Sequence, residues 1–197
     1  AFLWKTVSYH KEKDVQDGLE KLFSAKGENV FDFGWWNLLW YDPENRGGNY
    51  KNIPKTAYFK DIGLVIIREG WDENDTAVMF KCGPLGGYSL NKFRKEHNYC
   101  YVNVAHDDPD ANSFTLFTKG KMVAETDRYS SSKKSRNHNT IIVDGEGQVV
   151  PGRKEGMVWS QPAVGNVDMT TLAYITKFKD SGDIVMVEGE CGRSYRH

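Results

Sequence analysis

Apolar and polar residues alternate with two different periods along the chain, and the period changes near residue 55. Before that point, apolar residues recur at helical spacing between Asp14, expected to cap a helix, and Gly27, expected to end it. The recurring residues are Val15, Leu19, Leu22 and Phe23. A second, aromatic helix is expected over residues 31–41. Residues 42–55 are rich in Gly, Asn and Pro, which is typical of a linker.

Beyond the linker, short β-rich runs are separated by turns about every 8–12 residues, a spacing typical of all-β domains. The expected strands are Thr56–Phe59, Gly63–Glu69, Thr76–Cys82, Tyr99–Val104, Ser113–Thr118, Lys121–Glu125, Asn139–Val143, Met157–Gln161, Asp168–Phe178 and Ile184–Gly189. Strands without intervening helices predict an antiparallel sandwich or a barrel-like pair of sheets. The sequence therefore predicts a mainly β protein, with a short helical segment and its linker over 1–55 and an antiparallel domain over 56–197.

Composition narrows the classes of partner. The 197 residues carry a net charge of −1, which provides no overall field for nucleic acid or an anionic membrane. No apolar run reaches the roughly 18 residues of a membrane-spanning helix. No two of the three cysteines, Cys82, Cys100 and Cys191, have the Cys-x-x-Cys spacing of a zinc site. Three free buried thiols are favoured over a single bridge between Cys82 and Cys100.

The densest group of reactive side chains begins at His106, which is followed by Asp107, Asp108 and Asp110. Together with Asp127 and His138, Asp108 offers two oxygens and one nitrogen from three separate strand ends. This donor set suits Zn²⁺, with Mn²⁺ and Ca²⁺ as alternatives. Spacing alone favours a plainer interpretation, in which the two aspartates cap turns and His138 is an ordinary loop histidine.

His106 is the second candidate, because a histidine at the end of a strand can act as a general base or stabilise a developing anion. A lone histidine is nevertheless more often structural. The basic loop that contains Lys133, Lys134 and Arg136 is interpreted as a solvated turn. The alternative is that its positive charges attract acidic sugars. Residues 83–88 resemble a mobile loop beside the site.

Several of these segments together resemble one family. They are His106–Phe114, the turn at Gly120, Asp127-Arg-Tyr129, Asn137-His138-Asn139-Thr140 with Asp144-Gly145, Phe59–Arg68 and Phe80-Lys-Cys-Gly-Pro84. The chain looks like the heparinase II/III-like polysaccharide lyases over roughly residues 31–190. Within that family, these segments most resemble the alginate-lyase-like branch.

The resemblance implies a larger enzyme, in which an (α/α) toroid precedes antiparallel β-sandwich modules and the active site lies between them. Residues 1–55 are then expected to be the end of the toroid with its linker, and 56–197 the first part of the sandwich. The missing remainder of the toroid would supply the family's catalytic tyrosine, for which this chain offers no matching position.

The resemblance also implies residue roles. His106 matches a histidine that assists catalysis, while Asp108, Asp127 and His138 match the positions that hold a divalent metal, expected to be zinc. Many relatives carry a second histidine at the position of Asp108. Arg94 and Arg136 are the candidate substrate-binding residues.

The expected activity is cleavage of a uronic-acid-containing polysaccharide, alginate or a glycosaminoglycan, by β-elimination. The acidic polysaccharide is the expected partner, and a polymeric substrate implies a periplasmic or secreted protein. This chain alone is expected to be inactive. The alternative is a non-catalytic β-sandwich that binds acidic glycans or serves as a scaffold.

Overall fold

The computed structural model describes most of the chain and divides it into two compact units, Ala1–Pro54 and Lys55–His197. The described residues are 2–27, 35–100, 102, 107–126, 133–149, 155 and 167–195. No helix within these residues has the length and apolar character required to cross a membrane.

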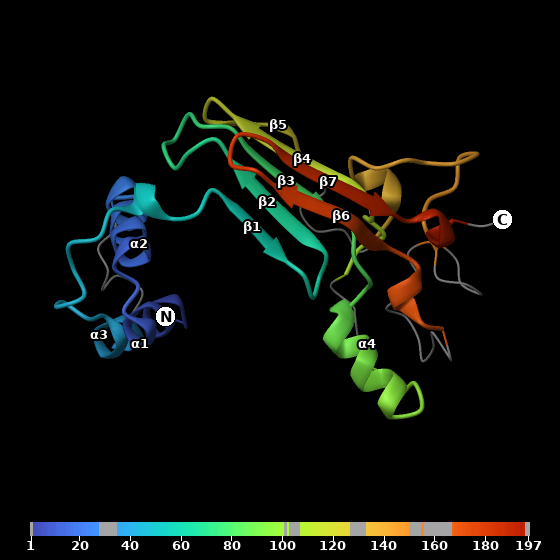
Figure 1. Ribbon diagram of the computed structural model, residues 1–197, viewed down its shortest axis with the longest axis horizontal. Helices are drawn as coiled ribbons and strands as arrows, with labels where there is room; N and C mark the ends of the chain where they lie inside the picture. The colour runs from blue at the N-terminus through green and yellow to red at the C-terminus, as the bar shows by residue number, and fades with distance from the viewer. Residues whose placement is uncertain are drawn as a thin grey trace. The chain divides into compact units, whose positions relative to one another are not determined.

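The first unit is helical. It contains α1 (Phe2–His10), α2 (Lys13–Ala25), α3 (Trp35–Trp40) and a short 3-10 turn, η1 (Tyr50–Asn52) (Figure 1). Trp4 is its central residue, because the indole is 1% exposed, stacks on Phe23 and meets Tyr41 edge to face. The predicted helix after Asp14 is confirmed, but its cap is wrong. The N-cap is Glu12, so Asp14 lies inside the first turn.

Residues 42–52 pack against α2 and belong to the first unit, which ends at Pro54, within the segment that the sequence marks as a linker. Gln16 donates from Nε2 to the Asp42 carbonyl at 2.9 Å, and Asn45 donates to Gln16 Oε1 at 3.0 Å. Asp14 accepts a bond from the backbone N–H of Asn49 at 2.7 Å. Although most of its residues are exposed, the segment is held to α2 by these hydrogen bonds, with Asn45 buried between them.

The second unit is built on a five-stranded antiparallel sheet in the order β1-β2-β3-β4-β5 (Figure 1). The strands are β1 (Thr56–Phe59), β2 (Leu64–Arg68), β3 (Ala77–Lys81), β4 (Ser113–Thr118) and β5 (Lys121–Ala124). Neighbours in sequence are neighbours in the sheet, but a helix, α4 (Gly87–Glu96), is inserted between β3 and β4. The insertion places the turn at 107–112 directly before β4.

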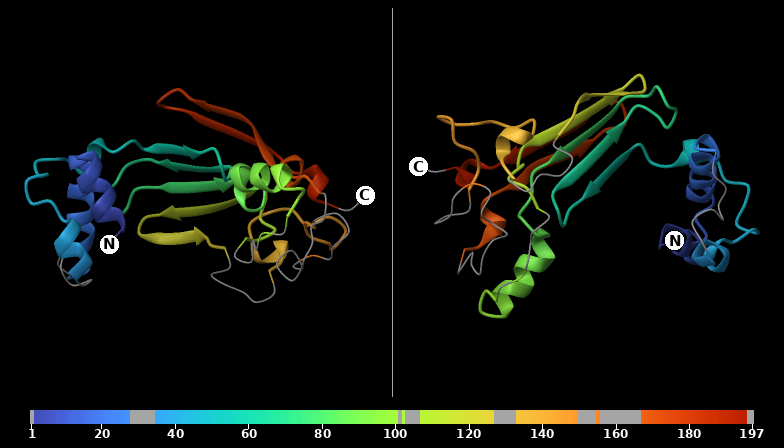
Figure 2. Two further views of the ribbon diagram at one scale, coloured as in Figure 1. Left: turned by 90° about the horizontal axis from the view of Figure 1, so that it is seen from below. Right: turned by 180° about the vertical axis from the view of Figure 1, so that it is seen from behind.

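A two-stranded hairpin, β6 (Tyr174–Asp180) and β7 (Val185–Glu190), forms a separate layer over one face of this sheet (Figure 2). Tyr58 and Val65 are paired across β1 and β2, so their side chains share that face. Val65 is fully buried, and the Tyr58 ring lies 5.0 Å from that of Phe178 on β6. The described residues therefore form antiparallel sheets of five and two strands, together with four α-helices.

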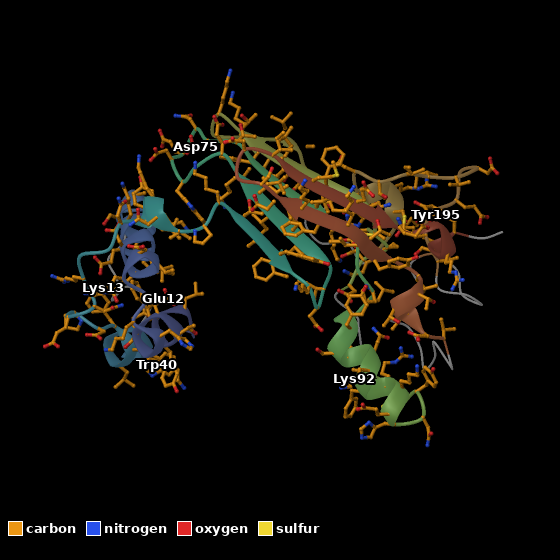
Figure 3. The ribbon with its side chains drawn as sticks, in the orientation of Figure 1. Glu12, Lys13, Trp40, Asp75, Lys92 and Tyr195 are labelled. Atoms are coloured by element: carbon orange, nitrogen blue, oxygen red, sulfur yellow. The ribbon has the colours of Figure 1, made fainter. Side chains whose placement is uncertain are left out.

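The buried cluster between the layers contains Cys82, Ala111, Ala173 and Cys191, with Phe80, Ile175 and Tyr195 packed against it. The Cys82 thiol donates weakly to the carbonyl oxygens of Tyr174 and Glu190, at 3.4 and 3.5 Å. Tyr195, labelled in Figure 3 beyond β7, donates from its hydroxyl group to the Ile141 carbonyl at 2.7 Å. All three cysteines are free thiols.

Three predicted strands differ from the structure. Residues 139–142 form no strand, and Val143 makes only an isolated bridge with Glu146. Tyr99 and Cys100 lie in the turn after α4, while most of the remaining range to Val104 is outside the described residues. A 3-10 turn, η3 (Met169–Thr171), precedes β6, so that strand begins later than expected. The predicted strand Met157–Gln161 lies outside the described residues.

Candidate functional site: an acidic turn with buried cations

The turn before β4 holds its carboxylates against buried donors. Asp110 accepts two bonds from the Lys81 ammonium, with Nζ at 2.7 Å from Oδ1 and 2.9 Å from Oδ2. Lys81 ends β3 and is paired with Ser113 on β4, which brings the lysine beside the turn. Burial alone would lower the pKa of Lys81, but the carboxylates of Asp110, Asp107 and Asp108 outweigh it and the pKa is raised. Lys81 is therefore a fixed positive charge within this acidic turn.

Asp107 contacts the start of α4. Its Oδ2 accepts a hydrogen bond from the backbone N–H of Gly86, the N-cap residue of the helix. Gly86 has a left-handed backbone with φ of 77°, a conformation that costs glycine little. Asp107 and Asp110 thus anchor the turn at α4 and at β3, while Asp108, between them, is directed to other partners.

Asp108 lies between a lysine and a histidine. The Lys133 ammonium donates to Oδ2 at 2.9 Å, and the Lys133 side chain is only 4% exposed. The other oxygen, Oδ1, lies 3.7 Å from Nε2 of His138, whose side chain is 5% exposed. The structure therefore brings together Asp108 and His138, two of the three predicted metal ligands. The third, Asp127, lies outside the described residues.

The two ring nitrogens of His138 have different surroundings. Nδ1 is hydrogen-bonded to the hydroxyl group of Thr126, whereas Nε2 is buried and has no hydrogen-bond partner within the described part of the chain. When Nδ1–H donates to Thr126, Nε2 presents a bare lone pair toward Asp108. An orphaned imidazole nitrogen beside a carboxylate oxygen fits a divalent cation of the zinc type. Among the described residues alone, no group of three or more His, Cys, Asp or Glu side chains is arranged to hold a metal.

A network of backbone and side-chain bonds fixes the turn against residues 133–149. Ser135 is fully buried, and its hydroxyl group donates to the Pro109 carbonyl at 2.7 Å. Its backbone N–H donates to Glu155 at 2.7 Å. The Gln148 amide exchanges two bonds with the backbone of Ala111, at 2.8 and 2.9 Å. Because these donors and acceptors are buried and paired, the positions of Asp108 and His138 are fixed from both sides.

The remaining predicted site residues have different surroundings. Residues 87–96, which include the end of the predicted mobile loop and Arg94, form α4, so the loop prediction is wrong there. Arg94 is 2% exposed and donates to Asn91 Oδ1 at 2.8 Å. Arg136 is exposed and contacts the Gly145 carbonyl at 3.4 Å. His106, the predicted catalytic residue, lies outside the described residues.

Sequence reasoning missed Lys133, Thr126 and Lys81. Lys133 was predicted to be part of a solvated turn, but it is buried against Asp108. The only sequence signal for Thr126 is that a hydroxyl-bearing residue precedes Asp127. Lys81 could have been found most easily from the sequence, because it ends an apolar strand and a charge buried there requires an oppositely charged partner.

No protein-family model matches this chain. Among solved structures, it is similar to heparan sulfate lyase HepC from Pedobacter heparinus, with 18% identity and a TM-score of 0.47 over 77% of this chain and 20% of that one. It is also similar to a heparinase III gene product, with 16% identity and a TM-score of 0.44 over 73% of this chain and 18% of that one. The chain spans about a fifth of the length of these two structures.

Proposed function

We propose that this chain is part of a polysaccharide lyase that cleaves a uronic-acid-containing polysaccharide, alginate or a glycosaminoglycan, by β-elimination. In this proposal, residues 56–197 are the first part of an antiparallel β-sandwich. Residues 1–55 are the end of an (α/α) toroid, whose remainder supplies further catalytic groups. The enzyme acts on its polymer in the periplasm or outside the cell.

The observation that supports the proposal most is the distance of 3.7 Å between Oδ1 of Asp108 and Nε2 of His138, a buried nitrogen without a hydrogen-bond partner among the described residues. The two residues come from separate segments that both belong to the resemblance with the heparinase II/III-like lyases. Asp108 is only two residues after His106 in the sequence. A cation bound by Asp108 would therefore be held by the same segment of chain as the proposed catalytic histidine.

Asp108 and His138 would hold a divalent metal, with Asp127 as the proposed third ligand. When bound, zinc supplies a fixed double positive charge that draws these side chains together and stiffens the turn. Thr126 orients the His138 ring, and Asp107 and Asp110 tie the turn to α4 and β3. These residues position the segment after His106 and do not themselves move protons.

β-Elimination requires three tasks of the complete enzyme. The uronate carboxylate must be neutralised so that the neighbouring carbon proton becomes acidic, a base must remove that proton, and an acid must protonate the leaving oxygen. We assign His106 to the first or second task. Arg136, which is exposed, is the proposed contact for the acidic polymer, whereas the burial of Arg94 and its bond to Asn91 leave that arginine to support α4.

The test uses the complete polypeptide that contains this chain. It is incubated with alginate, heparin and chondroitin sulfate, and the ultraviolet absorbance of the unsaturated product is followed. We expect product from at least one polymer, and loss of that product in His106→Ala. His97→Ala is the matched control, because His97 is an exposed histidine at the end of α4.

Unchanged turnover in His106→Ala would remove its catalytic role. Binding of a polymer without any unsaturated product would favour the non-catalytic glycan-binding module.

A further inference from the structure

Lys133 is more buried than the lysines of four other ion pairs in the described residues, including Lys81, whose side chain is 26% exposed. The lysines of the pairs Lys11–Asp42, Lys92–Glu96 and Lys177–Glu188 are at least half exposed. Exposed pairs of this kind contribute little to stability because water and salt screen them. The Lys133 side chain is 4% exposed, so its ammonium has lost nearly all contact with solvent. Such a desolvated charge requires a specific compensating partner.

The partner is the same carboxylate that faces His138. Lys133 occupies Oδ2 of Asp108 at 2.9 Å and leaves Oδ1 directed toward Nε2 of His138 at 3.7 Å. The two oxygens of one carboxylate therefore have separate tasks. One is neutralised by a cation of the chain itself, and the other remains beside a nitrogen without a hydrogen-bond partner in the described residues.

We infer that Lys133 is a built-in counter-cation, a positioning residue that holds Asp108 in place in the metal-free protein and weakens the binding of a divalent cation at Asp108 and His138. The inference rests on the metal site of the proposed function. Two physical effects support it. Without Lys133, a partly buried carboxylate, 26% exposed, would be left without its cation. With Lys133, the ligand set carries one negative charge less, and a positive charge lies close to any metal ion on Oδ1.

The first arm of the test needs no metal. Lys133→Met, Asp108→Asn and the double variant are prepared with chelator-treated buffer, and their melting temperatures are compared. We expect Lys133→Met to lower the melting temperature by several degrees, and the added Asp108→Asn to restore most of that loss because it removes the unpaired charge. Lys134→Met, at the neighbouring half-buried lysine, is the matched control. Additive losses in the double variant would overturn the inference.

The second arm measures zinc affinity by competition with a chromophoric chelator. We expect Lys133→Met to bind zinc at least tenfold more tightly than the unmodified chain, and Lys134→Met to bind it equally. A purely structural lysine would not produce tighter binding when removed, so equal or weaker affinity in Lys133→Met would overturn the inference. Absence of zinc binding in every variant would overturn it too. The lyase assay on the complete polypeptide decides the proposed function separately.

Discussion

The hydroxyl group of Thr126 and Nδ1 of His138 form a hydrogen bond that joins the end of β5 to the segment after residue 133. This bond occupies Nδ1, so Nε2 is the ring nitrogen left to face Asp108. With the proton on Nδ1, the ring directs a lone pair from Nε2 toward Asp108.

The Thr126 bond can be tested by removing the hydroxyl group. Thr126→Val keeps the shape of the side chain but takes away the acceptor for Nδ1–H. Because outer partners of metal-bound histidines typically contribute about 10–100-fold to affinity, we expect a loss of this size in zinc affinity. Isothermal titration with zinc would measure it. Thr115→Val on β4 is the matched control, and equal affinities in the two variants would contradict the role of Thr126.

The ion pair between Lys81 and Asp110 should contribute strongly to stability. Lys81→Met leaves the Asp110 carboxylate, 16% exposed, without its cation, and we expect a loss of about 2–4 kcal/mol in the free energy of unfolding. Lys92→Met is the matched control, because Lys92 is 77% exposed and lies 4.0 Å from Glu96, so we expect a change below about 0.5 kcal/mol. Urea denaturation followed by circular dichroism would compare the two. Similar losses would show that the Lys81 pair does not differ from a surface contact.

The Cys82 thiol should make stability depend on pH above neutrality. Burial raises the pKa of Cys82 from its usual 9.0 to about 11. Between these values the unfolded chain loses the thiol proton while the folded chain keeps it, so stability is full below pH 9 and falls as the pH rises to 11. The shift corresponds to about 2–3 kcal/mol.

Measuring the free energy of unfolding at pH 8 and pH 11 would reveal this loss. It should be smaller in Cys82→Ala and remain in Cys100→Ala. An equal pH dependence in all three proteins would contradict the assignment to Cys82.

In the first unit, Gly48 should tolerate no side chain. A Cβ atom added there would lie 2.1 Å from the Lys13 carbonyl oxygen, so Gly48→Ala must push residues 42–52 away from α2. At Gly47 an added Cβ meets no atom within 4 Å, and its φ of +84° predicts a cost of only about 1 kcal/mol. Thermal unfolding followed by tryptophan fluorescence should show the larger loss for Gly48→Ala. The opposite order would contradict the packing of this segment.

The sheet of the second unit could be predicted well from the sequence. The predicted bounds of β1 and β4 are confirmed, and β2, β3, β5 and β7 agree within one residue at each end. The reason is local, because β-rich runs alternate with turn residues such as Gly63, Gly120 and Gly182, all of which have positive φ. Turn residues and strand-forming residues favour the same structure in this region, so the local sequence is enough to predict where each hairpin begins and ends.

The predictions fail where polar side chains are buried in place of apolar ones, or form hydrogen bonds that a strand would make through its backbone. Helix α4 carries no apolar stripe, since its buried residues are Gly87, Asn91 and Arg94, and its periodicity therefore gives no signal. Residues 139–143 look like a strand, but Asn139 and Thr140 use their side chains to bond Phe114 and Ala111 instead. The burial of Lys133 depends on Asp108, in a distant segment, so local pattern could not reveal it.

The bonds from Ser135 to Pro109 and from Gln148 to Ala111 also limit how the acidic turn can be reused in protein engineering. Transplanting residues 107–111 alone onto another scaffold would transfer the carboxylates without the groups that orient them. A successful chimera would have to exchange this turn together with residues 133–149 as a single cassette.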